Sequence, residues 1–465
     1  MDTKLKKGIV AVLIANSINV FFSLATNFLL PAYLSVESYA GIKTFQLYVS
    51  YVGLLHFGYV DGMYLKYGGR ELEGNIEKEF STNISTMRIF QIFITACVFI
   101  IAVISKDWIL FFLTISILPL NMNNYFKYLY QATGEFKSYG RIINVTTMAT
   151  FAINILLLFV VKSDTYIFYI ASYVLLYILI WIILEINFKR THKINNGKVF
   201  SFTELLTNIK DGFILTLGNL ASMLLTSMDR WFVKLLMNVF DFAQYSFAVS
   251  VENFLNLAIT PITTTLYNYF CRETSIESHK QIYNYIVVFA SIIPAAAFPV
   301  KLILEIYLTQ YMEASRVVFI LFAAQMFYAI IKSIYVNLYK VQRKQKKYFS
   351  KLIFIIVIGF IFNGICFNII KNKEAFAIGT LLSAIVWFII TSYDFKYLKI
   401  PFSTILYLFC ELLIFLMFGL NFSAITGCVA YILITILMLY IFMRNTLREI
   451  CKKCIIVLKS LDHRS

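Results

Sequence analysis

The sequence predicts an all-α polytopic membrane protein with about 14 transmembrane helices, from three observations. Hydrophobic residues make up 60% of the 465 residues and charged residues 14%, whereas a soluble protein carries about a quarter charged residues. Apolar runs of helix length follow one another, as in residues 142–161 and 166–186. Lysine and arginine gather in alternate connections between these runs. Continuous apolar runs also exclude a β-barrel, whose strands alternate apolar and polar residues.

Hydropathy places the spans near residues 20, 52, 95, 120, 152, 176, 224, 256, 293, 326, 361, 386, 411 and 434. Alternate connections hold 30 of the 41 lysines and arginines, and the opposite connections hold six. This bias predicts that both termini are cytoplasmic. The first span follows three lysines but has no cleavage site, so we expect it to stay uncleaved. Because the net charge of +16 follows this pattern, we expect no nucleic-acid partner.

An internal repeat relates the two halves of the chain. Polar residues recur at helical spacing in the first span, and an offset of 203 residues aligns a second polar set with them: Asn16, Asn19, Ser23 and Thr26, then Asn219, Ser222, Thr226 and Asp229. An offset of 209 aligns Asn154 with Asn363 and Lys162 with Lys371. With six spans in each copy, equivalent helices cross the membrane in the same direction.

The repeat predicts the domain boundaries. We expect an N-terminal six-helix lobe at residues 1–187, a basic cytoplasmic linker at 188–212 and a C-terminal six-helix lobe at 213–400. Two additional transmembrane helices at 401–444 and a basic cytoplasmic tail at 445–465 complete the chain.

Charged residues within the predicted spans are the main functional signal. The stretch 222–256 carries Asp229, Arg230, Lys234 and Glu252 in an apolar run. A charge at the bilayer centre costs about 3 kcal/mol on insertion scales, so such residues normally face a bundle interior or a wet cavity. A structural explanation stays open, in which Asp229 and Arg230 neutralise each other and Lys234 reaches the membrane interface.

Further polar faces accompany these charges. The eighth span aligns Tyr245, Glu252, Asn256 and Thr263, and we expect Pro261 to break its helix. The tenth span aligns Gln325, Tyr328 and Lys332, and the repeat places Asn123 opposite Lys332. Together they predict a cationic cavity suited to a sugar phosphate, with these substrate-binding candidates: Arg230, Lys332, Lys127, Lys234, Asn123, Tyr328 and Gln325. The alternative is that tyrosine and asparagine only join helices.

Signatures of soluble enzymes are absent from the sequence, which has no phosphate-binding glycine loop and no metal-binding histidine pair. We therefore expect no enzyme, no cofactor and no metal site. Cys451 and Cys454 lack the second ligand pair that a zinc site needs. His56 lies near Asp61 in the second span, where a buried, hydrogen-bonded histidine is favoured over a proton relay.

With the repeat in view, the chain resembles the polysaccharide-type flippases of the multidrug/oligosaccharidyl-lipid/polysaccharide exporter superfamily, notably O-antigen flippases. The resemblance rests on the segment from Met228, Asp229 and Arg230 to Phe247, on the connection 339–348 and on the Asn363 region. It implies two six-helix lobes forming a V and alternating access in the bacterial inner membrane. The implied substrate is an undecaprenyl-pyrophosphate-linked oligosaccharide, and the implied partners are the lipid bilayer, a polysaccharide polymerase and a chain-length regulator.

Coupling and two other functions complete the expectations. Turning over a lipid-linked sugar needs a proton or sodium gradient, and the candidates for the cation site are Asp229, Glu252 and Asn219. The acids could instead only neutralise Arg230 and Lys234. A polymerase or lipid-linked glycosyltransferase usually needs a sizeable periplasmic segment, and the short external connections argue against one. A multidrug exporter would favour an acidic cavity, whereas this one has a basic excess.

Overall fold

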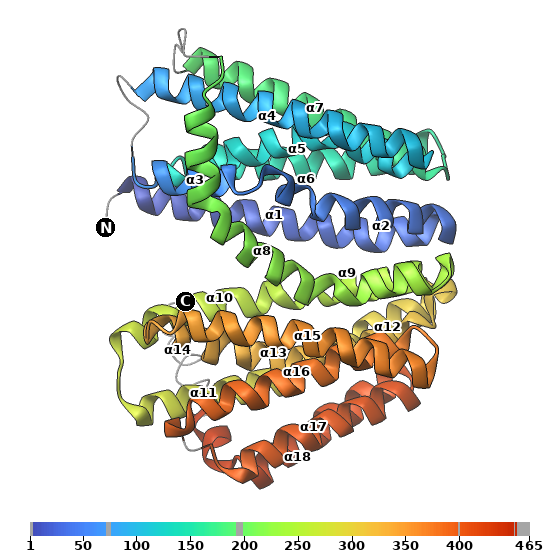
Figure 1. The fold of residues 1–465 in the computed structure, drawn as a ribbon. Coiled ribbons are helices and arrows are strands. Elements are labelled where there is room, and N and C mark those ends of the chain that lie inside the picture. Colours follow the sequence, from blue (N-terminus) through green and yellow to red (C-terminus); the bar gives the residue numbers. More distant parts are fainter. Residues whose placement is uncertain (1–2, 71–75, 192–198, 399, 451, 453–465) are drawn as a thin grey trace, which may run out of the picture. The chain divides into compact units, whose positions relative to one another are not determined.

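The computed structural model describes residues 3–70, 76–191, 199–398, 400–450 and 452, and these form helices joined by short connections without any strand (Figure 1). Contacts divide the chain into two compact units, Met1–Met223 and Leu224–Ser465. The boundary falls inside the continuous helix α8, Phe202–Leu236. Because α8 starts at Phe202, the second half of the predicted linker is helical. The all-helical fold class predicted from composition is confirmed.

The described residues of unit 1 form seven α-helices before α8, with a short 3₁₀-helix, η1, and a short π-helix, η2, between them. They are α1 (Thr3–Tyr33), α2 (Val36–Ser50), η1 (Val52–His56), α3 (Tyr59–Tyr67), α4 (Ile76–Ser105), α5 (Trp108–Ala132), α6 (Phe136–Ile155), η2 (Leu156–Val160) and α7 (Tyr166–Thr191). Helix α5 packs against both α4 and α7, and α1 packs along α6. The first half of α8 completes this unit.

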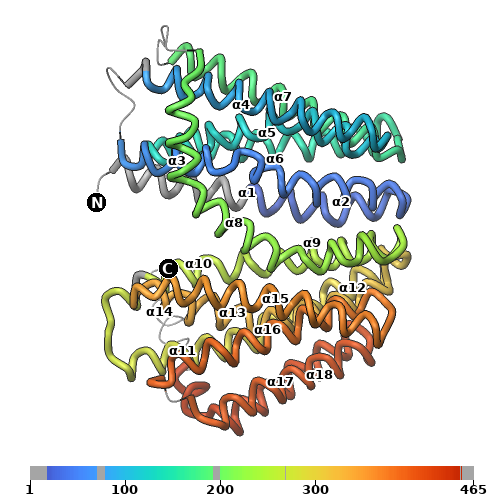
Figure 2. Tube along the Cα trace, viewed as in Figure 1, coloured from blue at the N-terminus to red at the C-terminus, as the bar shows by residue number. Residues whose placement is uncertain are grey.

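Unit 2 begins with the second half of α8 and has the remaining helices. They are α9 (Val239–Glu252), α10 (Leu255–Arg272), α11 (Ile276–Ile292), η3 (Ile293–Ala296), α12 (Ala297–Ile306), η4 (Thr309–Tyr311), α13 (Ala314–Ile330), η5 (Ile331–Tyr335), α14 (Val336–Val341), α15 (Gln345–Ile370), α16 (Glu374–Asp394), η6 (Lys396–Leu398), α17 (Phe402–Asn421) and α18 (Ala424–Phe442). Helix α13 is buried along nearly its whole length and contacts α9, α16 and α17. Figure 2 shows α17 and α18 side by side at one edge of this unit.

Each of the fourteen predicted spans corresponds to a helix or to a run of consecutive helices. Among the described residues, ten helical segments are long and apolar enough to cross a membrane. The other predicted spans correspond to α1, to α2 with α3, to α8 and to α9 with α10. These four carry most of the polar residues that the sequence singled out. Large apolar side chains such as Ile104 and Val160 are about three-quarters exposed, as expected of helices that face lipid.

The eighth predicted span is interrupted, but Pro261 does not cause the break. Helix α9 ends at Glu252 and α10 begins at Leu255, where Asn256 N and Leu257 N bond to the carbonyls three residues earlier. Pro261 lies inside α10, two turns after this new start. Its missing N–H costs less near the beginning of a helix than in the middle of a long one, so α10 continues through it.

The predicted repeat is visible in the caps that start α2 and α9. Ser35 caps α2 by accepting a hydrogen bond from Ser38 N at 3.3 Å. Asn238, its equivalent at the 203-residue offset, caps α9 by accepting from Asp241 N at 2.8 Å. Different side chains therefore perform the same capping function at equivalent positions.

Candidate functional site

The polar face predicted along the eighth span is a row of four hydrogen bonds within unit 2. The first two members bond to α8 and α13: Tyr245 Oη donates to Asp229 Oδ2 of α8 at 2.7 Å, and Glu252 Oε1 accepts from Gln325 Nε2 of α13 at 2.6 Å. The other two bond to η5: Asn256 Oδ1 accepts from Lys332 Nζ at 3.0 Å, and Thr263 pairs with Ser333 at 3.2 Å. The spacing of about one to two helical turns, read from the sequence, thus identified a real polar seam. We call these eight residues the α9–α10 seam.

Asp229 and Arg230 do not neutralise each other directly. The Asp229 carboxylate is buried and accepts from Tyr245 and from the backbone N of Arg230 at 2.8 Å. Adjacent residues on a helix point about 100° apart, so the two side chains diverge. Within the described part of the chain, Arg230 has no carboxylate at ion-pair distance, and its buried Nε atom has no hydrogen-bond partner. In the described part of the chain the two therefore form no ion pair at bonding distance, although their charges still interact over a longer range.

The other predicted cations of unit 2, Lys332 and Lys234, each lie over an aromatic ring. Lys332 Nζ lies over the Tyr328 ring, 5.7 Å from its centroid, besides its bond to Asn256. Lys234 Nζ lies over the Phe242 ring at 5.0 Å. Among the described carboxylates, none lies within ion-pair distance of Lys332, although the charges of Glu252 and Lys332 still interact over a longer range. The charged members of the α9–α10 seam, Asp229, Glu252 and Lys332, thus bond to neutral groups.

Three predicted residues lie in unit 1. Lys127 and Asn219 line a cavity of about 310 Å³ together with His56, Asp61 and Thr216. Asp61 Oδ2 accepts from Thr216 Oγ1 at 2.5 Å, and buried His56 accepts from Gly58 N through Nδ1 at 3.1 Å. The buried, hydrogen-bonded histidine was correctly predicted.

Asn123 has a structural contact instead of a place in that cavity, since its Nδ2 donates to the Tyr177 carbonyl at 3.0 Å. Unit 2 holds the remaining seven candidates, which are Arg230, Lys332, Lys234, Tyr328, Gln325, Asp229 and Glu252. These seven lie on α8, α9, α13 and η5. Cys451 and Cys454 lie outside the described residues.

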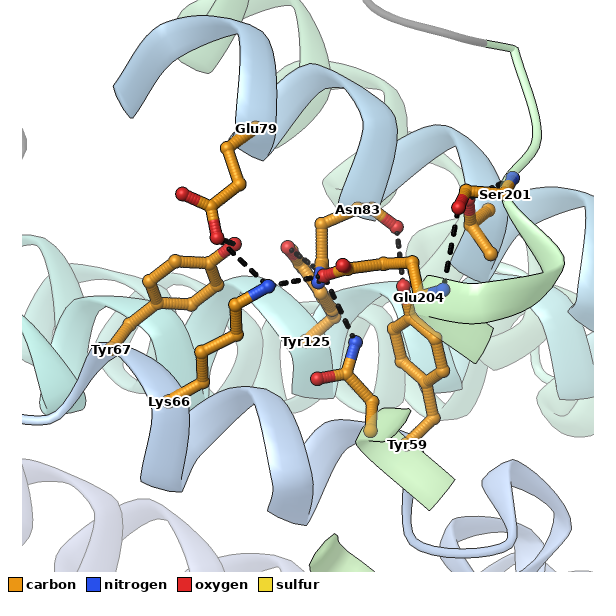
Figure 3. A network of polar contacts seen from close by, with 10 residues as sticks. Tyr59, Lys66, Tyr67, Glu79, Asn83, Tyr125, Ser201 and Glu204 are labelled. Atoms are coloured by element: carbon orange, nitrogen blue, oxygen red, sulfur yellow. Dashed lines mark hydrogen bonds and ion pairs between the residues drawn. The ribbon is translucent and has the colours of Figure 1, made fainter. Parts of the chain in front are cut away.

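A second polar network, in unit 1, was not predicted (Figure 3). Glu204 of α8 accepts from Lys66 at 2.7 Å and from Asn83 at 2.5 Å, and Lys66 also pairs with Glu79 at 2.8 Å. Asn83 in turn accepts from Tyr59 through its carbonyl and from Tyr125 through its side chain. The only sequence signal was a set of acids in polar connections, and Lys66 lies 138 residues from Glu204.

This Glu204 network ties four helices together, since its members come from α3, α4, α5 and α8. Beside it the backbones of α3 and α8 touch. A side chain at Gly62 would lie 2.0 Å from the Asn208 carbonyl oxygen, and one at Gly212 would lie 2.0 Å from the Gly58 carbonyl oxygen. Only glycine permits so close an approach.

No protein-family model and no curated protein matches the sequence. Solved structures do match. The lipid II flippase MurJ in an inward closed conformation aligns at a TM-score of 0.64 with 13% identity, over 94% of this chain and all of that one. A multidrug-resistance MATE family transporter of the MOP superfamily, in an inward-facing conformation, aligns at 0.54 with 12% identity, over 83% of this chain and 99% of that one.

Identities this low are informative about the fold alone. One matched protein is described as a flippase and the other as a transporter, and each is covered almost completely by this chain. The all-helical architecture, the apolar spans and the duplicated caps agree with that similarity. The chain has the fold of the multidrug/oligosaccharidyl-lipid/polysaccharide exporter superfamily.

Proposed function

We propose that the chain is a flippase that moves an undecaprenyl-pyrophosphate-linked oligosaccharide from the cytoplasmic to the outer leaflet of the bacterial inner membrane. Arg230 and Lys332 of unit 2 bind the pyrophosphate, and Lys127, Lys234, Asn123, Tyr328 and Gln325 are the further substrate-binding candidates. Asp229 and Glu252 are the candidates in unit 2 for binding the coupling proton or sodium ion, and Asn219 is a further candidate in unit 1. The fold supports a transporter of this superfamily, and the likeness to the lipid II flippase supports a lipid-linked substrate.

The single observation that carries the proposal is that the buried Nε of Arg230 has no hydrogen-bond partner among the described residues. Its guanidinium emerges from α8 next to a buried carboxylate that bonds elsewhere, and its buried Nε lacks a partner among the described residues. A cation inside a membrane protein is costly unless an anion compensates it. A pyrophosphate offers several oxygens to a planar guanidinium, which binds them bidentately. The lipid-linked anion would therefore supply the partner that the buried Nε of Arg230 lacks among the described residues.

Deletion and complementation test this function. A strain lacking the protein should accumulate complete lipid-linked repeat units at the cytoplasmic leaflet, measured by mass spectrometry, and should lose surface polysaccharide. The wild-type chain should restore both. Arg230→Gln should restore little and Arg230→Lys an intermediate amount, because an ammonium keeps the charge and loses the bidentate geometry.

Arg316→Gln is the matched control, since Arg316 is an exposed arginine at the start of α13 outside the α9–α10 seam. It should behave as wild type. Membrane abundance is compared for all variants, because an arginine needed only for folding would lower the protein level when removed. A normally abundant Arg230→Gln variant with wild-type polysaccharide would exclude the substrate-binding role.

Multidrug export is the second candidate, because the MATE transporter match also exceeds a TM-score of 0.5. Export of cationic drugs would make the deletion strain drug-sensitive and leave its lipid-linked sugars unchanged. If the chain were a polymerase, the deletion strain would instead accumulate single repeat units on the outer leaflet, where added periplasmic enzymes could reach them. Partners such as a polymerase and a chain-length regulator belong to the flippase proposal and would be sought by crosslinking in the native strain.

Orientation is part of the proposal as well. The basic bias of the connections supports cytoplasmic termini and a cytoplasmic position for residue 195. Alkaline phosphatase fused at residue 195 or after Ser465 should therefore be inactive. An active fusion at either position would reverse the topology and with it the direction of transport.

A further inference from the structure

Unit 1 contains a second cavity, of about 390 Å³, where α5, α6 and α7 end together. Its polar side is lined by Arg141, Arg190, Ser138 and Asn187. Both arginines are exposed, and in the described part of the chain neither guanidinium has a carboxylate at ion-pair distance. Glu135 also lines the cavity and accepts from Ser138 at 3.2 Å. The charged side chains of the lining therefore sum to a net positive charge.

The other side of the cavity is apolar and open to the lipid-facing surface. It is formed by successive turns of α6 and α7, through Ile142, Val145, Ile180, Ile183 and Leu184. Val145 and Ile183 are about half exposed, so the apolar wall continues onto the outer surface of unit 1. A site with guanidinium groups at one end and aliphatic side chains along the other fits a molecule with an anionic head and a hydrocarbon chain.

Comparison with unit 2 explains why no carboxylate of α7 bridges to α6 at this cavity. At the 209-residue offset, Glu185 of α7 corresponds to Asp394 of α16. Asp394 turns toward α15 and binds Lys347 at 2.9 Å and Lys351 at 2.6 Å. Glu185 turns toward α4 instead, where it binds Arg88 at 2.5 Å, and it also pairs with Lys189. The α6–α7 corner of unit 1 therefore lacks the carboxylate that joins α15 to α16 in unit 2.

The cavity lies at a membrane interface by the position of its helices. It is formed at the C-terminal ends of the spans Trp108–Ala132 and Tyr166–Thr191 and at the N-terminal end of the span Phe136–Val160. The connections at this end belong to the lysine- and arginine-rich set, which indicates the cytoplasmic side. The cytoplasmic leaflet holds anionic lipids, and basic pockets between transmembrane helices on that side bind their head groups.

We propose that this cavity binds an anionic phospholipid of the cytoplasmic leaflet. Arg141 and Arg190 bind the phosphate, Asn187 donates a hydrogen bond to the head group, and an acyl chain follows Val145 and Ile183. The site is separate from the α9–α10 seam and does not depend on the proposed transport function. Its ligand is a resident lipid of the bilayer.

Lipid binding to the purified full-length protein tests the proposal. The probes are phosphatidylglycerol, phosphatidylethanolamine and phosphatidylcholine, added to detergent-solubilised protein, with retained lipid counted by native mass spectrometry and the unfolding midpoint measured in parallel. Phosphatidylglycerol should bind the wild type at least tenfold more tightly than phosphatidylcholine and should raise its unfolding midpoint. The double variant Arg141→Gln/Arg190→Gln should lose that preference at least tenfold and show no rise.

Lys137→Gln/Lys189→Gln is the matched control, because it removes the same charge from the same two helix ends outside the cavity lining. It should keep phosphatidylglycerol affinity within about twofold of wild type. The unfolding midpoint without lipid shows whether each variant is folded. Equal phosphatidylglycerol binding by folded wild type and arginine variant would overturn the site. Equal binding of phosphatidylethanolamine or phosphatidylcholine to the wild type, or the same stabilisation by inorganic phosphate alone, would overturn the assignment to an anionic lipid.

Discussion

The two units meet the same structural need with different chemistry at equivalent positions. In unit 1, Asp164 lies at the start of α2, where Ser35 N donates to its side chain at 2.7 Å and Ser38 Oγ donates to its carbonyl. In unit 2 the equivalent of Asp164 is Lys373, and the equivalent of Ser38 is Asp241. Lys373 binds Asp241 at 2.9 Å. One contact is thus a set of hydrogen bonds and the other an ion pair.

This difference teaches that the repeat preserves which positions touch and not which residues occupy them. A helix end needs its backbone groups satisfied and its neighbour held, and several side chains do either. The same reasoning explains how the chain aligns with the lipid II flippase at a TM-score of 0.64 with only 13% identity.

The units also differ in their interiors. Carboxylates of the Glu204 network pair with lysine, whereas those of the α9–α10 seam bond to neutral groups.

The largest expected effect tests the backbone contact found in unit 1. Gly212→Ala places a methyl group 2.0 Å from the Gly58 carbonyl oxygen and 2.3 Å from Gly62 N. Overpacking a core costs about 1–3 kcal/mol, and a clash between two backbones lies at or above the upper end. We expect a loss of about 3 kcal/mol in unfolding free energy and a clear fall in membrane abundance, measured by thermal unfolding in detergent and by immunoblot.

Gly218→Ala is the control, because it lies six residues later on the same helix and a side chain there meets nothing within 4 Å. It should leave stability unchanged or raise it slightly, since alanine favours the helix by about 1 kcal/mol over glycine. If both variants are equally stable, the contact between α3 and α8 is looser than the structure shows.

The second prediction compares the carboxylates of the two polar networks. Glu204→Gln removes the charge that Lys66 and Asn83 bind, and because this ion pair is partly buried its loss should cost about 1–3 kcal/mol, between the values for exposed and buried pairs. Glu252→Gln retains an oxygen that accepts from Gln325 and removes a charge without an ion-pair partner among the described residues. Its unfolding free energy should change by less than about 1 kcal/mol. Unfolding midpoints of the two purified variants give the comparison directly.

Transport separates the same two variants further. Under the proposed coupling role, Glu252→Gln should abolish the response of transport to the ion gradient in vesicles, whereas the Glu204 variant should retain it at whatever abundance it reaches. Asp229→Asn is measured beside them because Asp229 is the other candidate. Full complementation by both the Glu252 and Asp229 variants, with an intact response to the gradient, would disprove coupling through these acids.

The third prediction concerns the carboxylates Glu185 and Asp394, whose equivalent positions bind different helices. Asp394 accepts from Tyr339 at 2.5 Å besides its two lysines. Because these lysines are partly exposed, Asp394→Asn should cost about 1 kcal/mol. A double-mutant cycle should show coupling of Asp394 with Lys351, and of Glu185 with Arg88. Ser138 of α6 is the equivalent of Lys347 at the 209-residue offset. Coupling of Glu185 with Ser138 would therefore contradict the prediction, because it would show that Glu185 joins α6 to α7 as Asp394 joins α15 to α16.

The smallest effect is a pH dependence at the Lys373 contact, outside the membrane spans. The hydrogen bond and charge of Lys373 hold the pKa of the Glu313 carboxyl below its usual value of 4.5. A depressed pKa contributes stability above the pKa of the unfolded chain, and this contribution is lost as pH falls through the folded value. Because the Glu313 side chain is 68% exposed, we expect about 0.5 kcal/mol or less.

Lys373→Gln should therefore flatten the fall of the unfolding midpoint between about pH 5 and pH 3. Glu313→Gln should flatten it by a similar amount, because it removes the same titration. A wild-type slope in both variants would mean that this ion pair contributes nothing measurable.

Patterns along single helices were predictable from the sequence. Fourteen spans, the polar face of Tyr245, Glu252, Asn256 and Thr263, and the buried His56 follow from hydropathy and helical spacing. The hydrogen-bond partners of that face on α8 and η5 lie 16 to 76 residues away. Such pairs depend on how helices pack, so the sequence could propose the residues and not their partners.

Features made by several helices escaped the sequence reading. The Glu204 network joins residues separated by more than a hundred positions, and the glycine contacts of α3 with α8 leave only isolated glycines in the sequence. The break after Glu252 was placed too late, because proline is a stronger local signal than the hydrogen bonding that ends α9. The direction in which Glu185 turns is likewise decided by Arg88 on another helix.

The glycine contacts and the Glu204 network together have a consequence for motion. They fix α8 from Glu204 to Thr216 against unit 1 through backbone contact and ionic hydrogen bonds. Gly218 follows this fixed segment. A side chain there would meet nothing within 4 Å, and glycine has the greatest backbone freedom of any residue. We therefore expect amide hydrogen exchange in α8 to be slow in the fixed segment and faster from Gly218 onward.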